Sequence, residues 1–239
     1  MNTAKIIAVT KPLISVNGNT ITSQMTNGIP LNVDEFVAYV ARVSNPSNQN
    51  NHETAPKLLK YLAKHKHWSP FEMVNIVMEI ETTRDIARQI LRHRSFSFQE
   101  FSQRYADPTK DLGFVTREAR LQDTKNRQNS IEISQAESES AANLISDWDW
   151  MQLALQEKAK EAYKWAIENG IAKEQARAVL PEGLTVSRMY MNGTLRSWIH
   201  YCQLRMGPET QKEHREVAQS AWEKIVEEFP SLSEVVTNN

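Results

Sequence analysis

Arginine side chains are concentrated in one stretch of the chain, where their number and spacing could serve the recognition of an anion. The stretch contains Arg84, Arg88, Arg92, Arg94 and Arg104. Like charges four residues apart on a helix cost roughly a few tenths of a kcal/mol per pair, so such a stripe favours an anionic partner. Phe98, Ser102 and Tyr105 lie in or beside the same stretch and add stacking surfaces and neutral hydrogen-bonding groups. Because guanidinium groups bind phosphate oxygens in bidentate pairs, the combination is typical of a site for a nucleotide.

Two other interpretations of this arginine cluster are open. A basic helix face is more often solvated or salt-bridged than part of a site, since exposed ion pairs are common and weak. Arginines interleaved with aromatic residues could also bind nucleic acid without catalysis. The formal net charge of −1 at pH 7 counts against a nucleic-acid partner, because no overall positive field attracts the chain to a phosphate backbone.

The composition is that of an ordinary globular protein. Of the 239 residues, 24% are charged and 40% are hydrophobic, and a chain of this length can bury one substantial core. The sequence shows no apolar run long enough to span a bilayer and no secretory signal at its beginning. Cys202 is the only cysteine, which excludes an internal disulfide and a cysteine-based zinc finger. We therefore expect a cytoplasmic protein with no membrane partner.

Hydrophobic periodicity predicts strands and helices in alternation. Strands are expected at residues 4–9, 73–81 and 184–190, and helices at 32–45, 54–66, 82–94, 149–169, 173–179, from 195 onward and at 211–229. Residues 95–112 show no clean period and are expected to form a structured loop or a broken helix. Residues 120–146 are rich in polar side chains and are the best candidate for a mobile insertion. Without an internal repeat or a clean linker, residues 1–239 are predicted to form a single α/β (α+β) domain.

The glycines exclude one common cofactor fold. They are Gly18, Gly28, Gly113, Gly170, Gly183, Gly193 and Gly207. No two of them are close enough to form the Gly-x-Gly-x-x-Gly loop that holds a pyrophosphate, so a Rossmann dinucleotide site is excluded. A flavin or nicotinamide dinucleotide would therefore have to be held by side-chain cations.

The candidate nucleophiles and metal ligands have structural explanations. Cys202 lies in a predicted amphipathic helix and is expected to be a packed thiol. Ser102 has no dedicated base beside it, so we expect it to contact a ligand and not to act as a nucleophile. No carboxylate or cysteine completes a ligand set around His65 and His67, and we expect no metal site. His214 is expected at the protein surface or at a helix cap. The helical stripe of the last helix is expected to be core or subunit interface; it comprises Val217, Ala218, Ala221, Ile225 and Phe229.

The arginine cluster resembles the signature of a known enzyme family, the flavin-dependent thymidylate synthases. That signature is Arg-His-Arg followed after seven residues by Ser, which matches Arg92, His93, Arg94 and Ser102, and Arg104-Tyr105 completes its longer form. Other segments resemble the family in order and approximate spacing. They are His67-Trp68-Ser69-Pro70-Phe71-Glu72, Ala176-Arg177 with Leu180-Pro181, Thr194-Leu195-Arg196-Ser197, His200 and Leu204-Arg205. The resemblance covers about residues 65–215.

The resemblance implies a set of site residues, carried over position by position. The expected dUMP-binding residues are Gln89, Arg92, Glu100, Phe101, Ser102, Gln103, Arg104, Arg177 and Arg205, with the backbone amides of residues 100–102 contributing. The expected FAD-binding residues are His67, Ser69, Arg92, His93, Arg94, Glu100, Thr194, Arg196 and His200. Arg205 is expected to be the catalytic residue, because a fixed cation beside the uracil stabilises its anion. Many family members carry Asn at the positions of Thr194 and His200.

The same resemblance implies a reaction, its cofactors and an assembly. Members of the family methylate dUMP to dTMP, taking the carbon from 5,10-methylenetetrahydrofolate and the reductant from NADPH through FAD, and they release tetrahydrofolate. Their fold has a central mixed or antiparallel sheet with packed helices, and their active sites are shared between the subunits of a homotetramer. We expect the same here. The alternative hypothesis is a nucleotide- or nucleic-acid-binding module that uses the arginine cluster without catalysis.

Overall fold

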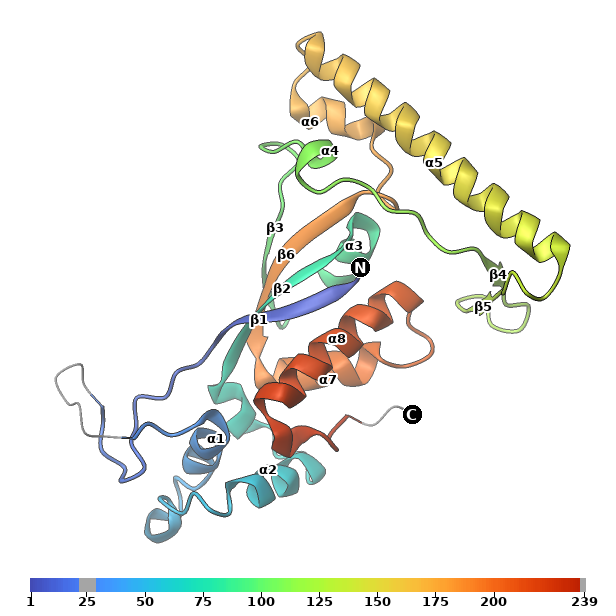
Figure 1. Cartoon of the computed structure of the whole chain (residues 1–239). Helices are drawn as coiled ribbons and strands as arrows, with labels where there is room; N and C mark the ends of the chain where they lie inside the picture. The colour runs from blue at the N-terminus through green and yellow to red at the C-terminus, as the bar shows by residue number, and fades with distance from the viewer. Residues whose placement is uncertain (22–28, 237–239) are drawn as a thin grey trace.

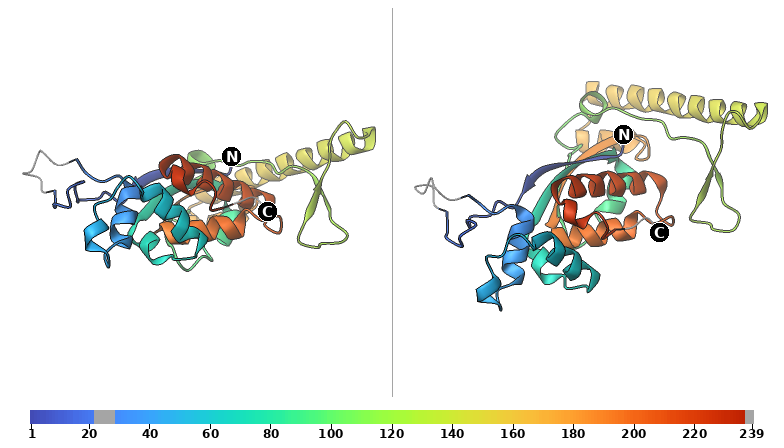
Figure 2. Two further views of the ribbon diagram at one scale, coloured as in Figure 1. Left: turned by 90° about the horizontal axis from the view of Figure 1, so that it is seen from below. Right: turned by 60° about the horizontal axis from the view of Figure 1, so that its bottom comes forward.

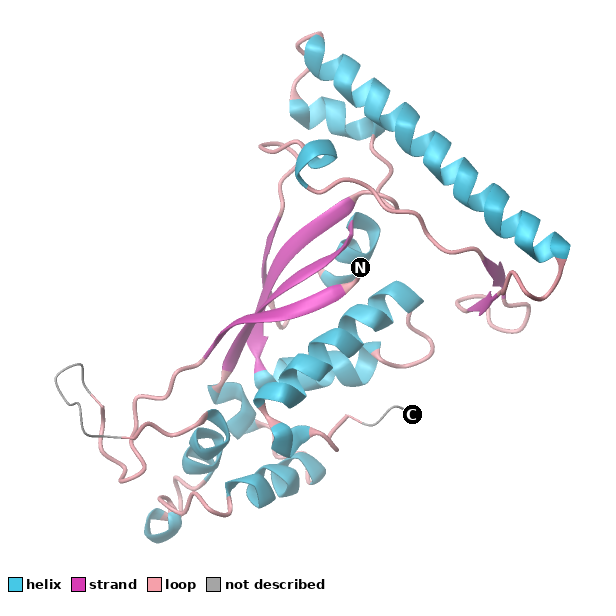
Figure 3. Ribbon diagram, in the orientation of Figure 1, coloured by secondary structure: helices cyan, strands magenta, loops and turns pink. Residues whose placement is uncertain are grey.

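A four-stranded antiparallel sheet forms the centre of the protein (Figures 1 and 3). The computed structural model describes residues 1–21 and 29–236, so Gly28 lies outside the described residues. The strands stand in the order β1 (Thr3–Val9), β2 (Asn75–Thr83), β6 (Val186–Thr194) and β3 (Ser97–Glu100). The predicted α+β fold is thereby confirmed, and its antiparallel sheet differs from the parallel sheet of a Rossmann fold.

The two central strands, β2 and β6, pair along their whole length. Asn75 lies opposite Thr194 at one end and Thr83 lies opposite Val186 at the other, with no irregularity between them. The side chains alternate between the two faces of the sheet. One face is apolar and fully or almost fully buried, and it carries Ile76, Met78, Ile80, Met189 and Met191. The opposite face carries polar pairs such as Glu81 with Arg188, whose charged groups lie 2.8 Å apart.

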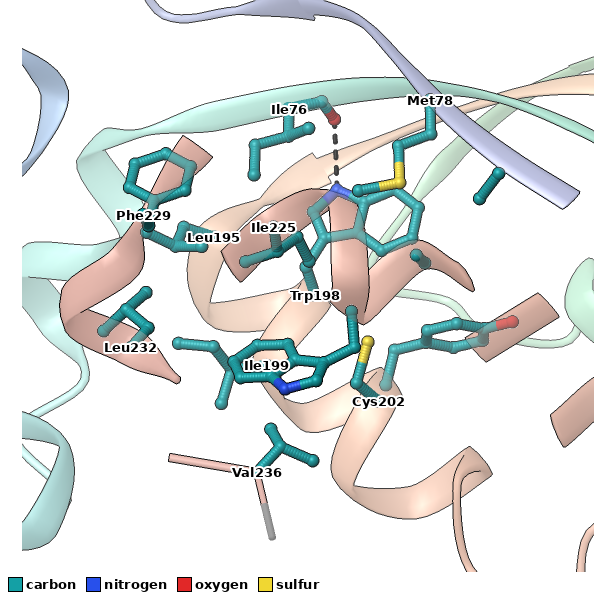
Figure 4. Close-up of a cluster of buried hydrophobic side chains, with 14 of the residues drawn as sticks. Ile76, Met78, Leu195, Trp198, Ile199, Cys202, Ile225, Phe229, Leu232 and Val236 are labelled. Carbon is teal, nitrogen blue, oxygen red and sulfur yellow. Dashed lines mark hydrogen bonds between the residues drawn. The ribbon is translucent and has the colours of Figure 1, made fainter. Parts of the chain in front are cut away.

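Helices α7 (Leu195–Arg205) and α8 (Lys212–Glu228) cover the apolar face of the sheet (Figure 1). Strand β6 runs directly into α7, and the Thr194 hydroxyl caps the helix by accepting a hydrogen bond from the Ser197 amide at 3.2 Å. Trp198 is fully buried between sheet and helices and donates its indole N–H to the Ile76 carbonyl at 3.1 Å (Figure 4). Cys202 is also fully buried, which confirms the packed thiol, and burial raises the pKa of that thiol. The predicted stripe of α8 is core within this one chain.

Shorter helices close one end of the sheet. Helix α1 (Val33–Ala41) begins with a capping box. The Glu35 amide donates a hydrogen bond to the Asn32 side chain at 2.8 Å, and the Asn32 amide donates one to the Glu35 carboxylate at 2.8 Å. Helix α2 (Ala55–Lys64) follows. Short 3-10 helices lie at Pro46–Asn48, Ser69–Met73, Arg177–Val179 and Pro230–Leu232.

The longest helix, α5 (Glu139–Glu168), lies outside the sheet and its covering helices (Figures 1 and 2). Tyr163 and Ala166 pack it against α6 (Lys173–Ala176) and the residues that follow. Much of its remaining surface is apolar and exposed, including Trp148, Trp150, Met151, Leu153, Leu155 and Trp165. The hairpin of β4 (Arg120–Gln122) and β5 (Ser130–Glu132) precedes it.

Helix α3 (Arg84–Ile90) is shorter than the helix predicted over residues 82–94, because β2 continues through Thr83. Because the helix also ends at Ile90, Arg92 lies beyond it, and Arg84, Arg88 and Arg92 do not form one stripe along a helix. Arg84 is buried and lies 3.4 Å from Glu100, and Arg88 lies 3.0 Å from Glu182. For these two arginines the salt-bridged interpretation is correct.

The prediction for residues 95–112 and 120–146 was only partly right. Residues 95–112 contain strand β3 and the short helix α4 (Pro108–Asp111), neither of which has enough residues to show a period. The polar insertion is folded into the β4–β5 hairpin, and α5 begins at Glu139, ten residues before the predicted start. The first turns of α5 are solvated on most sides, so they carry no apolar stripe that the sequence could reveal.

Two classes of feature are absent over residues 1–21 and 29–236. No helix there combines the length and the apolar character needed to cross a membrane. No three side chains of His, Cys, Asp or Glu are placed together to hold a metal ion.

We predict that Gly193→Ala destabilises the protein and displaces the segment that carries Arg92–Arg94. A Cβ at Gly193 would lie 2.3 Å from Cδ1 of Phe96, whose ring packs edge-on against Trp198 at 4.9 Å between centroids. Overpacking of this kind costs about 1–3 kcal/mol and should lower the thermal midpoint by several degrees. Gly183→Ala is the matched control, because its added Cβ has nothing nearer than Asp85 Oδ2 at 4.0 Å. Equal midpoints for the two variants would contradict the close approach of Phe96.

Candidate functional site

Arg205 and His93 form a pair at the centre of the predicted site, although 112 residues separate them in sequence. Arg205 ends α7, and His93 lies in the turn after α3. The Nε of Arg205 donates a hydrogen bond to Nε2 of His93 at 2.9 Å. Burial, followed by the charges of Arg205 and Arg92, lowers the pKa of His93 to about 4. The imidazole is therefore neutral at pH 7 and can accept this bond, which fixes the guanidinium and leaves its two terminal amino groups for a ligand.

Gln89 and His214 adjoin this pair. His214 is fully buried, so its predicted place at the surface or at a helix cap is wrong. It lies three and four residues before Val217 and Ala218 and therefore shares their core-facing side of α8. Its Nε2 lies 3.1 Å from the Tyr201 hydroxyl, and its Nδ1 lies 3.3 Å from Oε1 of Gln89. Burial, followed by the charges of Arg205 and His93, lowers the pKa of His214 to about 3, so it too is neutral.

Some of the predicted site residues at the end of β3 already bond to other groups of the same chain. The Glu100 carboxylate accepts a hydrogen bond from the Ser187 hydroxyl at 2.8 Å and pairs with Arg84. The Phe101 amide donates to the Arg188 carbonyl at 2.8 Å. Because that amide is occupied in the sheet, the predicted contribution of the Phe101 N–H to dUMP binding does not fit this geometry. Ser102 is half-buried, and Gln103 is buried.

Arg104 and Arg177 are brought together by one acidic residue. The Glu174 carboxylate lies 3.4 Å from Arg104 Nη2, and the Glu174 carbonyl accepts a hydrogen bond from Arg177 Nε at 3.2 Å. Lys173 donates to the Tyr105 carbonyl at 2.9 Å and ties the loop after β3 to α6. This phosphate-end cluster, Arg104 and Arg177 with Glu174, has an excess of positive charge and suits an anion.

A second cluster, the helix-start cluster, lies where α7 begins beside the 3-10 turn Ser69–Met73. It contains the predicted residues His67, Ser69, Thr194, Arg196 and His200. Arg196 pairs with Glu72, and the Thr194 hydroxyl is engaged as the helix cap. The His200 ring packs edge-on against Trp68 at 4.9 Å between centroids, and burial, followed by the charge of Arg196, lowers its pKa. His67 and Ser69 are exposed.

Arg92 and Arg94 lie in the exposed turn between α3 and β3. In the described part of the chain, neither forms a salt bridge with an acidic side chain. The Ser197 hydroxyl donates to the Ser95 carbonyl at 3.4 Å, which holds this turn beside the helix-start cluster.

The two clusters lie at opposite ends of the sheet (Figure 1). Arg188, whose carbonyl binds the Phe101 amide, and Thr194 are six residues apart on β6. At about 3.4 Å per residue, this separation is about 20 Å along the strand. One chain therefore does not bring Arg104 and Arg177 next to Arg196 and His200.

A cleft of about 940 Å³ lies between the β4–β5 hairpin, α5 and the start of α8. It is lined by Arg120, Arg127, Trp148, Met151, Gln211 and Arg215 among others, and by none of the predicted site residues. Gln211 connects it to the predicted site, because its Oε1 accepts a hydrogen bond from Gln89 at 2.8 Å. Neither Gln211 nor His214 could be identified as a site neighbour from the sequence, since both lie over 120 residues from Gln89.

We predict that His214 makes the stability of the protein depend on pH below neutrality. Its pKa is about 3 in the folded chain, against 6.5 when unperturbed. Between these values the unfolded chain binds a proton that the folded chain does not, so the free energy of unfolding falls as the pH falls below 6.5. His214→Gln should reduce this slope by up to about 1.4 kcal/mol per pH unit, measured by urea unfolding between about pH 5 and 7. His65→Gln, at an exposed position, is the control; an unchanged slope in His214→Gln would refute the role of His214.

Comparison with known proteins identifies relatives along nearly the whole chain. Residues 30–231 match the family described as thymidylate synthase complementing protein. Over 233 residues the chain is 44% identical to a probable flavin-dependent thymidylate synthase of Paramecium bursaria Chlorella virus 1, covering 98% of each chain. It is also 44% identical over 229 residues to a flavin-dependent thymidylate synthase of Synechocystis sp., covering 96% of each chain.

A solved structure shares the fold. It is a UMP/dUMP methylase, PolB from Streptomyces cacaoi, bound with 5-Br UMP; the TM-score is 0.71 at 22% identity, over 98% of this chain and 94% of that one. At this identity the likeness concerns the fold alone. The matches over residues 30–231 and to the two relatives confirm the family that the Arg92–Ser102 signature indicates: the chain belongs to the thymidylate synthase complementing protein family, that of the flavin-dependent thymidylate synthases.

Proposed function

We propose that the protein is an enzyme that methylates dUMP to dTMP, as a flavin-dependent thymidylate synthase. The observation that carries the proposal is the Arg205–His93 pair, which places a fixed guanidinium beside the Arg92–Ser102 signature. Two relatives that are 44% identical over nearly the whole chain bear the name of this enzyme. The solved neighbour with the same fold acts on UMP and dUMP.

The nucleotide would be held by positive charge at two points. Among the described residues, Glu174 is the one acidic residue that contacts both Arg104 and Arg177, and the surplus positive charge of the two arginines suits the phosphate. Arg205 would face the uracil with the amino groups that His93 leaves unused, and a fixed cation there stabilises negative charge that develops on the ring. Neutral His93 is essential to this arrangement, because a protonated imidazole could not accept from Arg205. Gln89, Ser102 and Gln103 would complete the contacts to dUMP.

The residues of the helix-start cluster and of the adjoining turn that carries Arg92 and Arg94 fit FAD by their chemistry. Arg92 and Arg94 are exposed cations able to neutralise a pyrophosphate. His200, whose pKa is lowered by burial and by the charge of Arg196, lies beside Trp68 and offers a ring donor near an aromatic surface. His67, Ser69, Thr194 and Arg196 would add further polar contacts. When bound, FAD reduced by NADPH supplies the hydride, and 5,10-methylenetetrahydrofolate supplies the carbon.

A covalent nucleophile on the protein is not part of this proposal. Cys202 is fully buried, and burial raises the pKa of its thiol, so it can neither reach a uracil ring nor ionise at neutral pH.

The complete site would require more than one subunit. The phosphate-end cluster and the helix-start cluster are about 20 Å apart along β6, farther than a nucleotide and an adjacent isoalloxazine can bridge in contact. A homotetramer with shared sites, as the family resemblance implies, would bring the two clusters of different subunits together. The exposed apolar side chains of α5 support such an assembly, because a large exposed apolar surface is typical of a protein–protein interface.

The decisive measurement is dTMP formation from dUMP, NADPH and 5,10-methylenetetrahydrofolate, with and without added FAD. We predict that Arg205→Lys lowers this turnover by about 10²-fold, because lysine lacks the Nε–H that His93 orients. Arg188→Lys is the matched control, since Arg188 is exposed and pairs with Glu81. A colourless wild-type protein without turnover, but with oligonucleotide binding that weakens steeply with salt, would favour a nucleic-acid-binding module instead.

We predict that two inactive variants complement each other when their subunits are mixed. Arg104→Ala removes an arginine of the phosphate-end cluster, and Arg196→Ala removes the arginine of the helix-start cluster. If each site takes one cluster from each of two subunits, random assembly after co-expression restores about one quarter of the sites. Light scattering should give four times the 27.4 kDa of one chain. Activity no higher than that of either variant alone would mean that the site is not divided in this way.

A further inference from the structure

A chain of hydrogen bonds connects the predicted dUMP residue Gln89 to a buried carboxylate outside the predicted site. Gln89 Nε2 donates to Gln211 Oε1 at 2.8 Å, and Gln211 Nε2 donates to Glu213 Oε2 at 2.9 Å. On its other side, Oε1 of Gln89 lies 3.3 Å from His214 Nδ1. Glu213 is only 7% exposed and His214 is fully buried, so both ends of this series of bonds are shielded from water, while Gln89 and Gln211 between them are half-buried.

The donor and the acceptor of every hydrogen bond in this series follow from the Glu213 carboxylate at its end. An ionised carboxylate accepts only, so the amide atom of Gln211 that faces Glu213 must be its nitrogen. The oxygen of Gln211 then faces Gln89, which must present its own nitrogen there and its oxygen to His214. His214 consequently carries its proton on Nδ1, and its Nε2 accepts from the Tyr201 hydroxyl at 3.1 Å. No other combination of amide orientations and tautomer satisfies all four contacts.

Two arginines keep Glu213 charged in a buried place. Arg117 Nη1 lies 3.1 Å from Glu213 Oε2, and Arg120 pairs with its other oxygen. Burial opposes the charge, but the backbone amide of Glu213 and these arginines more than offset it and keep its pKa below the usual value. Arg117 is fixed in turn by Asp85 at 2.7 Å and by the Gly183 carbonyl at 3.1 Å.

We propose that Glu213, acting through Gln211 and assisted by His214, is a positioning residue that sets the orientation of the Gln89 amide, so that its second Nε2 hydrogen points to an acceptor oxygen of dUMP. The inference rests on the proposed function, because it assigns a purpose to Gln89 at the nucleotide. An amide side chain can rotate by half a turn with little change in shape, and a half-exposed Gln89 without this chain would present oxygen and nitrogen alternately. Glu213, at the start of α8, thereby acts on the nucleotide without touching it.

The test is a double-mutant cycle in which calorimetry measures the Kd for dUMP of the FAD-loaded enzyme. Glu213→Gln removes the carboxylate that fixes the direction and should raise the Kd for dUMP by about fivefold, the value of roughly one hydrogen bond. Gln89→Ala should raise it at least as much. In the Gln89→Ala background, Glu213→Gln should have no further effect, because its influence passes through Gln89. A merely structural role would instead add the two effects.

Matched variants keep the test independent of folding. Glu81→Gln makes the same substitution at an arginine-paired carboxylate on the open face of the sheet, and it should leave the Kd unchanged. If Glu213→Gln does not fold, Gln211→Met interrupts the chain without removing the partner of Arg117 and Arg120, and it should raise the Kd in the same way. The flavin content of all variants should equal that of the wild type.

The possible failures are distinguishable. Wild-type enzyme that does not bind dUMP would overturn the proposed function and this inference with it. Wild-type binding with an unchanged Kd in Gln89→Ala would leave the function intact but remove Gln89 from the site. A normal Kd in both Glu213→Gln and Gln211→Met, with Gln89→Ala impaired, would overturn the positioning role alone.

Discussion

The pairing of β2 with β6 is the constraint on which the rest of the structure depends. Its nine pairs run without a bulge from Asn75 opposite Thr194 to Thr83 opposite Val186, and each strand passes directly into a helix. Strand β2 leads into α3, which ends just before His93, while β6 leads into α7, which ends at Arg205. A shift of one residue in this register would turn the buried methionines and isoleucines to the opposite face and would separate these two ends. The Arg205–His93 contact therefore depends on the whole strand pair.

Charge at the site is controlled by neutral histidines placed among arginines. His93 and His214 lie near Arg205, and both have pKa values far below 6.5, for which burial is the leading cause and the neighbouring cations are the second. A protonated histidine in either place would add like charge and could not accept from Arg205 or Tyr201. Burial thus converts two titratable rings into fixed hydrogen-bonding groups over the neutral pH range. The charge of Arg205 is left for a ligand because His93 and His214 beside it carry none.

Much of the fold could be predicted because the elements concerned bury one regular face or carry a strong terminal signal. The helix start at Asn32, the alternation of β2 and the stripe of α8 are all present as expected. Strand β3 is too short to show alternation, and the first turns of α5 have no apolar stripe. The site motifs could be recognised by residue type and spacing. Their distribution over two ends of the sheet could not, because it depends on the register in which β3 pairs with β6, which places Phe101 beside Arg188.

His214 shows most clearly why the remaining site residues escape a reading of the sequence. A lone histidine in an otherwise polar helix segment has the composition of a surface residue, and only its spacing from Val217 and Ala218 hints at the core. Its functional neighbours come from α3 and α7, and the contact with Gln89 spans 125 residues. Residues that bind a ligand directly are restricted in type by the chemistry of that ligand, so a motif preserves them in recognisable form. Residues that orient those side chains need only supply a donor or an acceptor at the right place, and many types can do so. We assign Glu213 and Gln211 to this second kind, and the support for that assignment is the direction of their hydrogen bonds in the folded structure.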